Sequence, residues 1–371
     1  MGRAASNHGA FAQGGTRAVT HLLCTGGGTA GHVLPAVPVM QRALASGWRV
    51  TFVGSRSGLE QRLLGDLPVR YLGITTGKLR RYIAWENLVD AFRVGIGMCQ
   101  ALLLLWRLRP DVVFSKGGFV SFPVVFAAGC LRIPVLAHES DLSPGLANRL
   151  ALPFVRTLAF TFPGSRVPGF RGRQVVAGSP LRPALRLGDA ARGRAWLGVT
   201  AQRPVLLVTG GSLGADRLNR AVIEALPRLL PQFTVVHVCG PGKRTDIDAP
   251  GYIALEFVRD EWGDVLAAAD LVVSRAGANT LFELLALRKP ALLVPLSARA
   301  SRGDQLENAA WAVAAGYCQS QADDGLDGAS LFAAVDAAWS ARAALSAALA
   351  TFKAPDAVAV LWSELERLCP N

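Results

Sequence analysis

Short apolar segments rich in β-branched residues alternate with amphipathic segments along almost the whole chain. Each apolar segment ends in glycine or a polar residue, a pattern typical of parallel β-α-β units. In the first half we expect strands at 19–25, 48–54, 111–116, 134–139 and 157–162. In the second half we expect them at 204–210, 234–240, 252–258, 271–277 and 291–296.

Two prolines interrupt this alternation in the segment GSPLRPALRLGD, residues 178–189, and indicate a domain boundary. We expect an N-terminal domain at 19–180 and a C-terminal domain at 181–350, preceded by a disordered leader at 1–18. The predicted fold is α/β, with two doubly wound, Rossmann-like domains that face each other across a cleft. The C-terminal helix, 355–371, is expected to pack back on the first domain.

Composition restricts the class of protein and of partner. Half of the residues are hydrophobic (51%) and 18% are charged, which excludes a disordered chain. The net charge of +12 favours an anionic partner. Nucleic acid is not expected, because no zinc-finger spacing, RNA-binding aromatic motif or long basic run is present. The six cysteines are scattered without a C-x-x-C pair, which indicates reduced thiols in a cytosolic protein.

The first predicted strand leads into GGGTAGH, where Gly26, Gly28 and Gly31 fit the dinucleotide fingerprint G-x-G-x-x-G. A dinucleotide site also needs an acidic residue at the end of the next strand, and that strand ends in Gly-Ser-Arg. Arg56 leaves an NADP enzyme open as an alternative. His32 follows the glycines at the expected first turn of a helix, where it either acts as a general base or only caps the helix.

Five more segments are expected to face the cleft. In HESDLSPGLANR, the side chains of His138, Glu139, Asp141 and Asn148 could bind a polyhydroxylated substrate, whereas Ser143 reads as a helix N-cap. SKGGFVSFP and TGGSLGADRLN are further turns from strand to helix.

In SRAGANTLFE, residues 277–280 form a helix start that suits a phosphate, and Glu283 lies one turn on, where a ribose would bind. In SRGDQLENAA, Asp304, Gln305 and Asn308 carry side chains suited to sugar hydroxyls. No metal-binding constellation is present, so no metal or other cofactor is expected.

Seven segments together resemble the MurG family of GT-B glycosyltransferases. They are GGTAGHVLP, KGGFVSFP, HESDLSPGLANR, GSPLR, GGSLGADRLN, SRAGANTLFE and SRGDQLENA, in the family's order, and the resemblance covers roughly 20–368. It implies transfer of GlcNAc from UDP-GlcNAc to the 4-hydroxyl of MurNAc in lipid I, which is undecaprenyl-pyrophosphoryl-MurNAc-pentapeptide. The product would be lipid II, a precursor of peptidoglycan, formed with inversion and without a metal for donor binding.

The resemblance also implies roles for individual residues. The general base would be His32, with Glu139 as its supporter or rival. The donor would be bound by Thr29, Ala30, Gly31, Asp141, Arg182, Ser212, Val258, Ala278, Asn279, Thr280, Glu283 and Gln305. The loops for the acceptor and its diphosphate would include Gly27, Gly28, Gly117, Gly118, Ser121 and Asn148.

One position departs from the family pattern. The family often has Gln-Asn after His-Glu, whereas this chain has Ser140-Asp141. An ionised aspartate accepts hydrogen bonds but cannot donate them, so a sugar contact that needs an amide N–H would be lost.

A lipid-linked acceptor requires docking at a membrane. The segment TTGKLRRYIAW combines cations with apolar and aromatic side chains, which suits an anionic bilayer surface. The residues of this predicted membrane surface are Lys78, Leu79, Arg80, Arg81, Tyr82 and Trp85. The following helix is apolar almost all round, so its apolar face could meet either the core or lipid. We expect a peripheral protein at the cytoplasmic face of the bacterial inner membrane, with anionic inner-leaflet lipids and other cell-wall synthesis proteins as further partners.

Three alternatives stay open. Another GT-B enzyme that uses a UDP-sugar, such as a glycolipid synthase or a UDP-GlcNAc epimerase, would share the donor motifs. An NADP-dependent reductase would explain the first glycine loop but not SRAGANTLFE. A catalytically silent UDP-sugar-binding protein would not need His32 and Glu139.

Overall fold

The structure is a computed structural model that describes residues 19–56, 59–65, 67–77, 85–200, 203–299, 301–369. For residues 59 and 85–91 only the backbone is described. The expected leader therefore lies outside the described residues. So do five residues of the predicted membrane surface, Lys78 to Tyr82, and the side chain of the sixth, Trp85.

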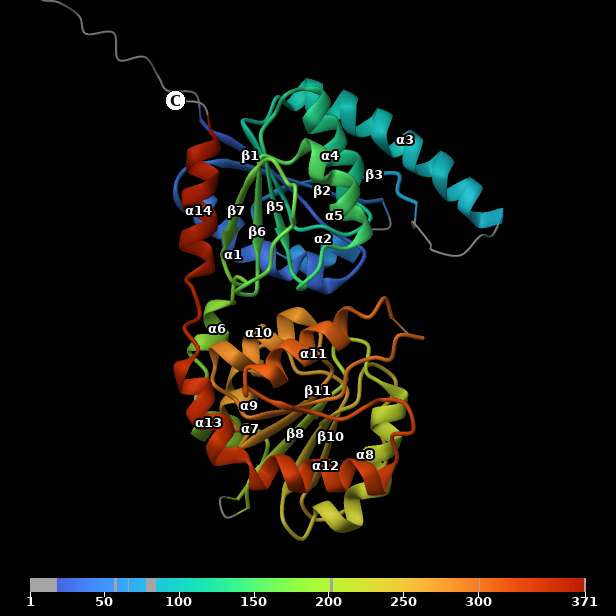
Figure 1. Ribbon diagram of the computed structural model, residues 1–371, viewed down its shortest axis with the longest axis vertical. Helices are drawn as coiled ribbons and strands as arrows, with labels where there is room; N and C mark the ends of the chain where they lie inside the picture. Colours follow the sequence, from blue (N-terminus) through green and yellow to red (C-terminus); the bar gives the residue numbers. More distant parts are fainter. Residues whose placement is uncertain are drawn as a thin grey trace, which may run out of the picture.

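The N-terminal half of the described chain forms one parallel sheet of seven strands in the order β3-β2-β1-β4-β5-β6-β7 (Figure 1). The strands are β1 (His21–Thr25), β2 (Arg49–Ser55), β3 (Arg70–Ile74), β4 (Val112–Ser115), β5 (Val135–Glu139), β6 (Thr157–Phe160) and β7 (Arg173–Val176). The helices of this half are α1 (Val37–Ala45), α2 (Leu59–Leu64), α3 (Trp85–Leu108), α4 (Ser121–Cys130) and α5 (Leu146–Ala151).

The C-terminal half forms a second parallel sheet, with six described strands in the order β10-β9-β8-β11-β12-β13. Its strands are β8 (Val205–Thr209), β9 (Thr234–Val238), β10 (Tyr252–Leu255), β11 (Leu271–Ser274), β12 (Ala291–Leu293) and β13 (Gln319–Ser320). Its helices are α7 (Ala190–Trp196), α8 (Asp216–Leu229), α9 (Trp262–Ala268), α10 (Ala278–Ala286), α11 (Asp304–Ala314), α12 (Gly328–Ser340) and α13 (Arg342–Thr351). The predicted architecture of two doubly wound α/β domains is confirmed.

The central strands are continuous apolar runs because both faces of each sheet are covered. Successive residues of β1 point to opposite faces: Leu22 and Cys24 pack in one core cluster, and Leu23 packs in another. All ten strands that the sequence predicts are present. Three further strands, β3, β7 and β13, were not predicted; all three are edge strands with partly exposed side chains, so they lack a continuous apolar run.

The chain crosses between the domains twice, through the segment around the short helix α6 (Pro183–Arg186) and through the segment between α13 and the last helix, α14 (Ala357–Leu368). Both crossings lie on the same side of the molecule (Figure 1). Gly178 in the first crossing has φ +78°, and a Cβ atom there would lie 2.8 Å from Cζ of Phe282. Only glycine fits at this position.

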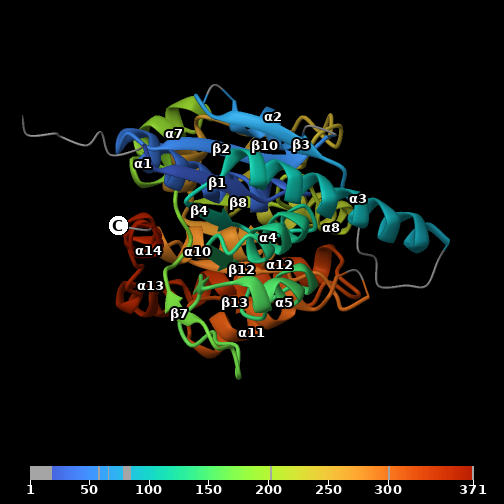
Figure 2. The same ribbon diagram turned by 90° about the horizontal axis from the view of Figure 1, so that it is seen from above.

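Helix α14 packs on the N-terminal domain although it follows the C-terminal one (Figures 1 and 2). Its Trp362 is 7% exposed and joins the core cluster of β1 and α1. The Trp362 ring lies 4.5 Å from the Trp48 ring, and the Arg42 guanidinium lies 5.5 Å from the Trp362 ring. The first domain is thus completed by the end of the chain.

Helix α3 extends away from the sheet (Figures 1 and 2). Its described side chains divide between a buried and an exposed face. Val94, Ala101 and Leu105 are buried in the domain. On the other face, Phe92, Ile96, Leu103 and Trp106 are exposed, with Cys99 between them, so an apolar stripe follows the helical repeat. The two interpretations of this helix, core and lipid, therefore apply to different faces. Among the described helices, none is long and apolar enough to cross a bilayer.

We predict that Trp362→Ala destabilises the N-terminal domain by about 3–5 kcal/mol, because the substitution leaves a cavity between α14 and α1. Calorimetry of thermal unfolding, in which the two domains can give separate transitions, measures the effect. The control is Trp196→Ala, at a 45% exposed tryptophan of α7, which should cost less than about 1 kcal/mol. Equal losses in the two variants would contradict the proposed docking of α14.

Candidate active site

The strand order places the predicted motifs at one edge of each sheet. All strands run parallel, but the direction in which successive strands are added to the sheet reverses between β1 and β4 in the first sheet and between β8 and β11 in the second. Ligands of doubly wound proteins bind at the carboxyl ends of the strands beside such a switch point. The first glycine loop and the SKGG turn follow β1 and β4, and the other two glycine-containing turns follow β8 and β11.

The first glycine loop does not lead directly into an α-helix. His32 lies in a 3₁₀ turn, Ala30–His32, which is followed by a second turn, Leu34–Ala36. Helix α1 begins only at Val37, so the expectation that His32 lies in its first turn was wrong. Pro35 and Pro38 explain this, because proline has no N–H to donate and fits only at a helix start.

A buried carboxylate fixes this loop through hydrogen bonds. Glu60 of α2 accepts a hydrogen bond from the backbone N–H of Gly28 at 3.0 Å and another from Ser55 Oγ at 2.6 Å. Glu60 is 1% exposed, and a Cβ atom on Gly27 would lie 2.3 Å from its Oε1. The N–H of Gly28 is therefore bound by the protein itself, which argues against the dinucleotide interpretation of the loop.

His32 is half-buried beside the SKGG turn. Its Nδ1 lies 2.9 Å from Thr29 Oγ1, and the described residues offer Nε2 no hydrogen-bond partner. Burial, and then the positive charges of Lys116 and Arg302, lower its pKa to about 4. The imidazole is therefore neutral at pH 7 and able to accept a proton.

Lys116 is a site residue that the sequence analysis did not single out. It directly follows β4, is 1% exposed, and donates from Nζ to Ser140 Oγ. Burial lowers its pKa to about 8, against the opposing effect of Glu139 and Asp141. The available signal was a lysine at the end of a buried strand, directly before two glycines.

Glu139, at the end of β5, organises the loop that follows it. Its side chain accepts hydrogen bonds from the N–H groups of Asp141 and Gly145, both at 3.1 Å, and from Asn148 Nδ2 at 2.8 Å. His138 is turned away from the cleft, because it is fully buried and its Nε2 lies 2.8 Å from the carbonyl oxygen of Gly178.

The SKGG turn and the HESD loop pack together. Gly117 and Gly118 have φ of +86° and +85°, and a Cβ atom on Gly117 would contact the buried Asn148 side chain. Ser121 begins α4, and its hydroxyl donates to the carbonyl oxygen of Gly118 at 2.7 Å. Ser143 is not the predicted N-cap: α5 begins at Leu146, and Ser143 Oγ donates to Glu307 of the other domain at 2.6 Å.

Asn279, in the first turn of α10, connects the two domains. Its Nδ2 donates to the carbonyl oxygen of Gly31 at 3.0 Å, and its Oδ1 accepts from Ser179 Oγ at 3.1 Å. The predicted phosphate-binding helix start, which includes Ala278 and Thr280, is thereby brought against the loop that carries Thr29, Ala30 and His32.

Glu283 lies one turn further along α10 and is not on a solvated surface. Burial raises its pKa to about 7, although the charge of Arg182 and a hydrogen bond with Trp262 act in the opposite direction. Arg182 and Glu283, which the resemblance places at the diphosphate and the ribose, are therefore neighbours.

The N-terminus of α11 approaches the HESD loop. Gln305 Oε1 accepts from the N–H of Leu296 at 3.0 Å, which leaves its amide donors available. Asn308 is buried, and its Nδ2 donates to Asp141 Oδ1 at 3.1 Å. Arg302, also missed by the sequence analysis, forms an ion pair with Asp141.

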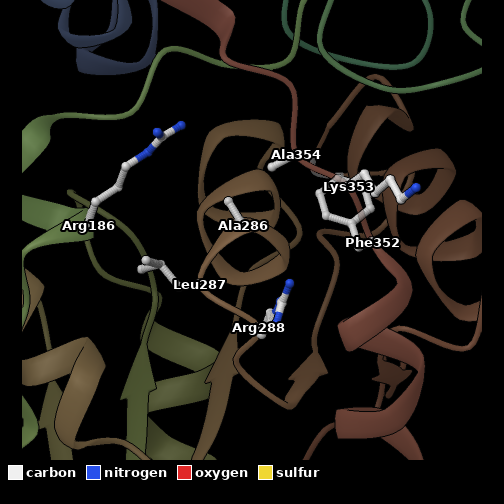
Figure 3. A pocket seen from close by; sticks show the side chains of 7 residues that line it. All are labelled: Arg186, Ala286, Leu287, Arg288, Phe352, Lys353 and Ala354. Carbon is white, nitrogen blue, oxygen red and sulfur yellow. The ribbon is translucent and has the colours of Figure 1, made fainter.

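Two of the predicted donor residues form no side-chain hydrogen bond or ion pair with the other described residues of the site. Ser212 is exposed in the loop between β8 and α8, and Val258 is buried between β10 and α9. A surface hollow beside the C-terminal end of α10 is lined by none of the predicted site residues (Figure 3). Among the described residues, no group of three or more His, Cys, Asp or Glu could hold a metal ion.

Comparisons with known proteins agree with this arrangement. Residues 22–160 match the N-terminal domain of glycosyltransferase family 28, and residues 205–361 match its C-terminal domain. In structure the chain is similar to MurG of Acinetobacter baumannii, with TM-score 0.76, 24% identity and coverage of 94% of this chain and 99% of that one. It is also similar to the calicheamicin glycosyltransferase CalG4, with TM-score 0.71, 16% identity and coverage of 95% and 98%.

In sequence, two relatives carry the same name, UDP-N-acetylglucosamine–N-acetylmuramyl-(pentapeptide) pyrophosphoryl-undecaprenol N-acetylglucosamine transferase. The protein of Legionella pneumophila (strain Lens) is 46% identical over 291 residues, 78% of this chain and 80% of the relative. The protein of Lachnospira eligens is 46% identical over 316 residues, 85% of this chain and 89% of the relative. At these identities and this coverage, the chain belongs to the MurG family of N-acetylglucosamine transferases, built from the two domains of glycosyltransferase family 28.

Proposed function

We propose that the protein transfers GlcNAc from UDP-GlcNAc to the MurNAc 4-hydroxyl of lipid I and so forms lipid II for peptidoglycan synthesis. Besides family membership, one contact carries the proposal. Asn279 of the C-terminal domain, which we take as the donor domain, donates to the carbonyl oxygen of Gly31, next to His32. A proton acceptor from one domain and a helix start from the other therefore meet in one cleft.

The transfer is a single displacement. The 4-hydroxyl oxygen of the acceptor attacks C1 of GlcNAc, its proton passes to Nε2 of His32, and the bond from C1 to the diphosphate oxygen breaks. Attack opposite the leaving group inverts C1. When Nδ1–H donates to Thr29 Oγ1, the lone pair of Nε2 is free to accept that proton.

The departing UDP carries the new negative charge. The N-terminus of α10, with Ala278, Asn279 and Thr280, offers backbone N–H groups and a positive dipole end to the diphosphate. Arg182 adds a cation next to this helix, and Ser212 adds a hydroxyl. No step requires a metal or another cofactor.

The remaining donor groups would bind the uridine and the sugar. We assign Val258 to the uracil, Glu283 to the ribose hydroxyls, and Gln305, Ala30 and Gly31 to GlcNAc. The acceptor would lie along Gly27, Gly28, Gly117, Gly118, Ser121 and Asn148.

We assign Glu139 a positioning role rather than the role of the base. Its two oxygens already accept three hydrogen bonds from the following loop and α5, and they would have to give these up to bind an acceptor hydroxyl. His32 has a free nitrogen and no such conflict.

Lipid I is held in a membrane, and we propose that the N-terminal domain docks peripherally on the anionic cytoplasmic leaflet. The exposed apolar stripe of α3 supports this proposal, since it extends the basic and aromatic segment 78–85 predicted as a membrane surface. Apolar side chains inserted at the interface and cations near it strengthen binding together.

We expect His32→Ala to lower transfer by about 10²–10⁴-fold while UDP-GlcNAc binding is retained, because a general base contributes on that order. The measurement uses radiolabelled UDP-GlcNAc with a short-chain lipid I analogue in the presence of EDTA, with calorimetry for donor binding. Glu139→Gln serves as the comparison. If His32→Ala stays active and Glu139→Gln does not, the base is Glu139.

UDP-GlcNAc should bind more tightly as the pH rises from 6 to 8. Glu283 has a pKa of about 7 and loses its proton in this range, and only the carboxylate accepts from both ribose hydroxyls. If binding requires the ionised form, the dissociation constant falls by up to about tenfold. Glu283→Gln should bind weakly without this dependence. Glu224→Gln, at a glutamate that binds the N–H of Gly328 away from the cleft, should retain it.

Replacing Phe92, Leu103 and Trp106 of α3 together by Glu should reduce binding to phosphatidylglycerol vesicles by at least about tenfold, because each buried apolar side chain is worth about 1.5–3 kcal/mol. Trp196→Glu, at an exposed tryptophan of the other domain, should leave vesicle sedimentation unchanged. Changing Lys78, Arg80 and Arg81 to Glu tests the basic segment in the same assay. Wild-type binding by both triple variants would exclude this surface.

A further inference from the structure

Two oppositely charged side chains meet where the domains approach each other. Asp141 lies in the loop after β5 of the N-terminal domain, which we call the acceptor domain. Arg302 lies just before α11 of the C-terminal, donor domain. Nη2 of Arg302 donates to Oδ2 of Asp141, and the two side chains are 27% and 17% exposed. The other carboxylate oxygen, Oδ1, accepts from Asn308 Nδ2 at 3.1 Å. Among the described residues, the hydrogen-bond partners of the Asp141 carboxylate, Arg302 and Asn308, thus both come from the opposite domain.

The same loop has two further contacts with α11. The N–H of Leu142 donates to Asn308 Oδ1 at 3.4 Å, and Ser143 Oγ donates to Glu307 Oε2 at 2.6 Å. On its other side the loop is fixed to its own domain by Glu139. The loop at 140–145 is therefore a rigid part of the acceptor domain that docks on the start of α11.

The two residues that depart from the family pattern, Ser140 and Asp141, are each bound by a cation, one from each domain. Lys116 of the acceptor domain binds Ser140, and Arg302 of the donor domain binds Asp141. Arg302 also approaches Asp304, with 3.4 Å between Nε and Oδ1. An aspartate cannot supply the N–H that an asparagine would offer to a sugar, but it can accept from a guanidinium.

We propose that Asp141 and Arg302 form an interdomain latch, which pairs when the cleft closes, fixes the 140–145 loop against α11 and brings a positive charge to the side of the cleft where His32 lies. Asp141 is then a positioning residue rather than a direct ligand of the donor sugar. The latch itself does not depend on the proposed reaction, whereas its effect on the base rests on it.

The latch connects closure to the state of His32. The charged groups that act on the imidazole are Lys116, from its own domain, and Arg302, from the other. Thr29 occupies Nδ1. When the cleft opens, Arg302 moves away with its domain and only Lys116 remains, so the pKa of His32 returns part of the way toward its ordinary value. The imidazole is therefore kept most completely unprotonated when the cleft is closed.

The ion pair also acts on Asp141. Burial and the charge of Glu139 raise the pKa of Asp141 to about 6, while Arg302 and Asn308 oppose this rise. Without Arg302 the carboxyl would take up a proton closer to neutral pH. Arg302 thus keeps Asp141 ionised in the closed cleft.

Distances between spin labels on the two domains test the latch without substrate turnover. Cysteines at the exposed positions Gln41 and Gln232 carry the labels, and Cys99, Cys130 and Cys369 are replaced by Ser. We expect Arg302→Gln to reduce the closed population relative to the open one by about fivefold, as for a coupling of about 1 kcal/mol. Arg302→Lys should retain part of the closure. The double variant Asp141→Asn with Arg302→Gln should lose less than the sum of the two single changes.

The matched control is Arg217→Gln, which removes an arginine paired with Asp323 and Asp324 inside the donor domain and should leave the distances unchanged. Wild-type distance distributions in Arg302→Gln, with and without UDP-GlcNAc, would overturn the latch even if transfer activity is present.

Titration of the His32 ring protons by NMR tests the link to the base. We expect its pKa to rise by about half a unit or more in Arg302→Gln and not in Arg217→Gln. In transfer assays at pH 8, Arg302→Gln should raise KM for UDP-GlcNAc more than it lowers kcat, because His32 is neutral at this pH in both the open and the closed cleft. An unchanged His32 titration would overturn the link between closure and the base.

Discussion

Two buried carboxylates hold the wall of the cleft that the acceptor domain provides. Glu60 binds the backbone of the first glycine loop, and Glu139 binds the loop after β5 at two points and Asn148 of α5 at a third. Loops at the ends of parallel strands have no partner strand to satisfy their N–H groups, so a side chain must do so. A carboxylate suits this task because it accepts several hydrogen bonds at once, and bonds to a charged acceptor are the stronger kind. The positions of His32, Ser140 and Asp141 all follow from these two anchors.

The sequence predicted the interior of the fold better than its edges. Strands buried on both faces are continuous apolar runs. The ten strands that are wholly or mostly apolar could therefore be identified directly from the sequence. The edge strands β3, β7 and β13 could not, because RYLGI, RQVV and QS mix polar and apolar residues. Their strand conformation depends on a neighbouring strand that is distant in sequence, and such pairing has no local signal.

The site shows the same division between local and long-range information. His32, Glu139 and Glu283 could be selected because each belongs to a segment that follows a predicted strand, where doubly wound proteins bind ligands. Lys116 lies within the SKGGFVSFP turn, but nothing local indicates that its ammonium would be buried against Ser140. Arg302 resembles an ordinary surface arginine in the sequence. Its importance arises from Asp141, 161 positions earlier, and only the folded chain brings the two together.

The electrostatics of His32, which we propose as the base, follow from this two-domain construction. Besides burial, two cations lower the pKa of His32, and one of them belongs to the opposite domain. A base of lowered pKa is weak, but the diphosphates of donor and acceptor bring negative charge into the cleft and oppose the two cations. The proton affinity of His32 should therefore rise as the substrates bind, so that the imidazole is neutral before binding and a stronger base in the complex. A single domain could not combine these states, because Arg302 and the helix start that we propose for the diphosphate both belong to the C-terminal domain.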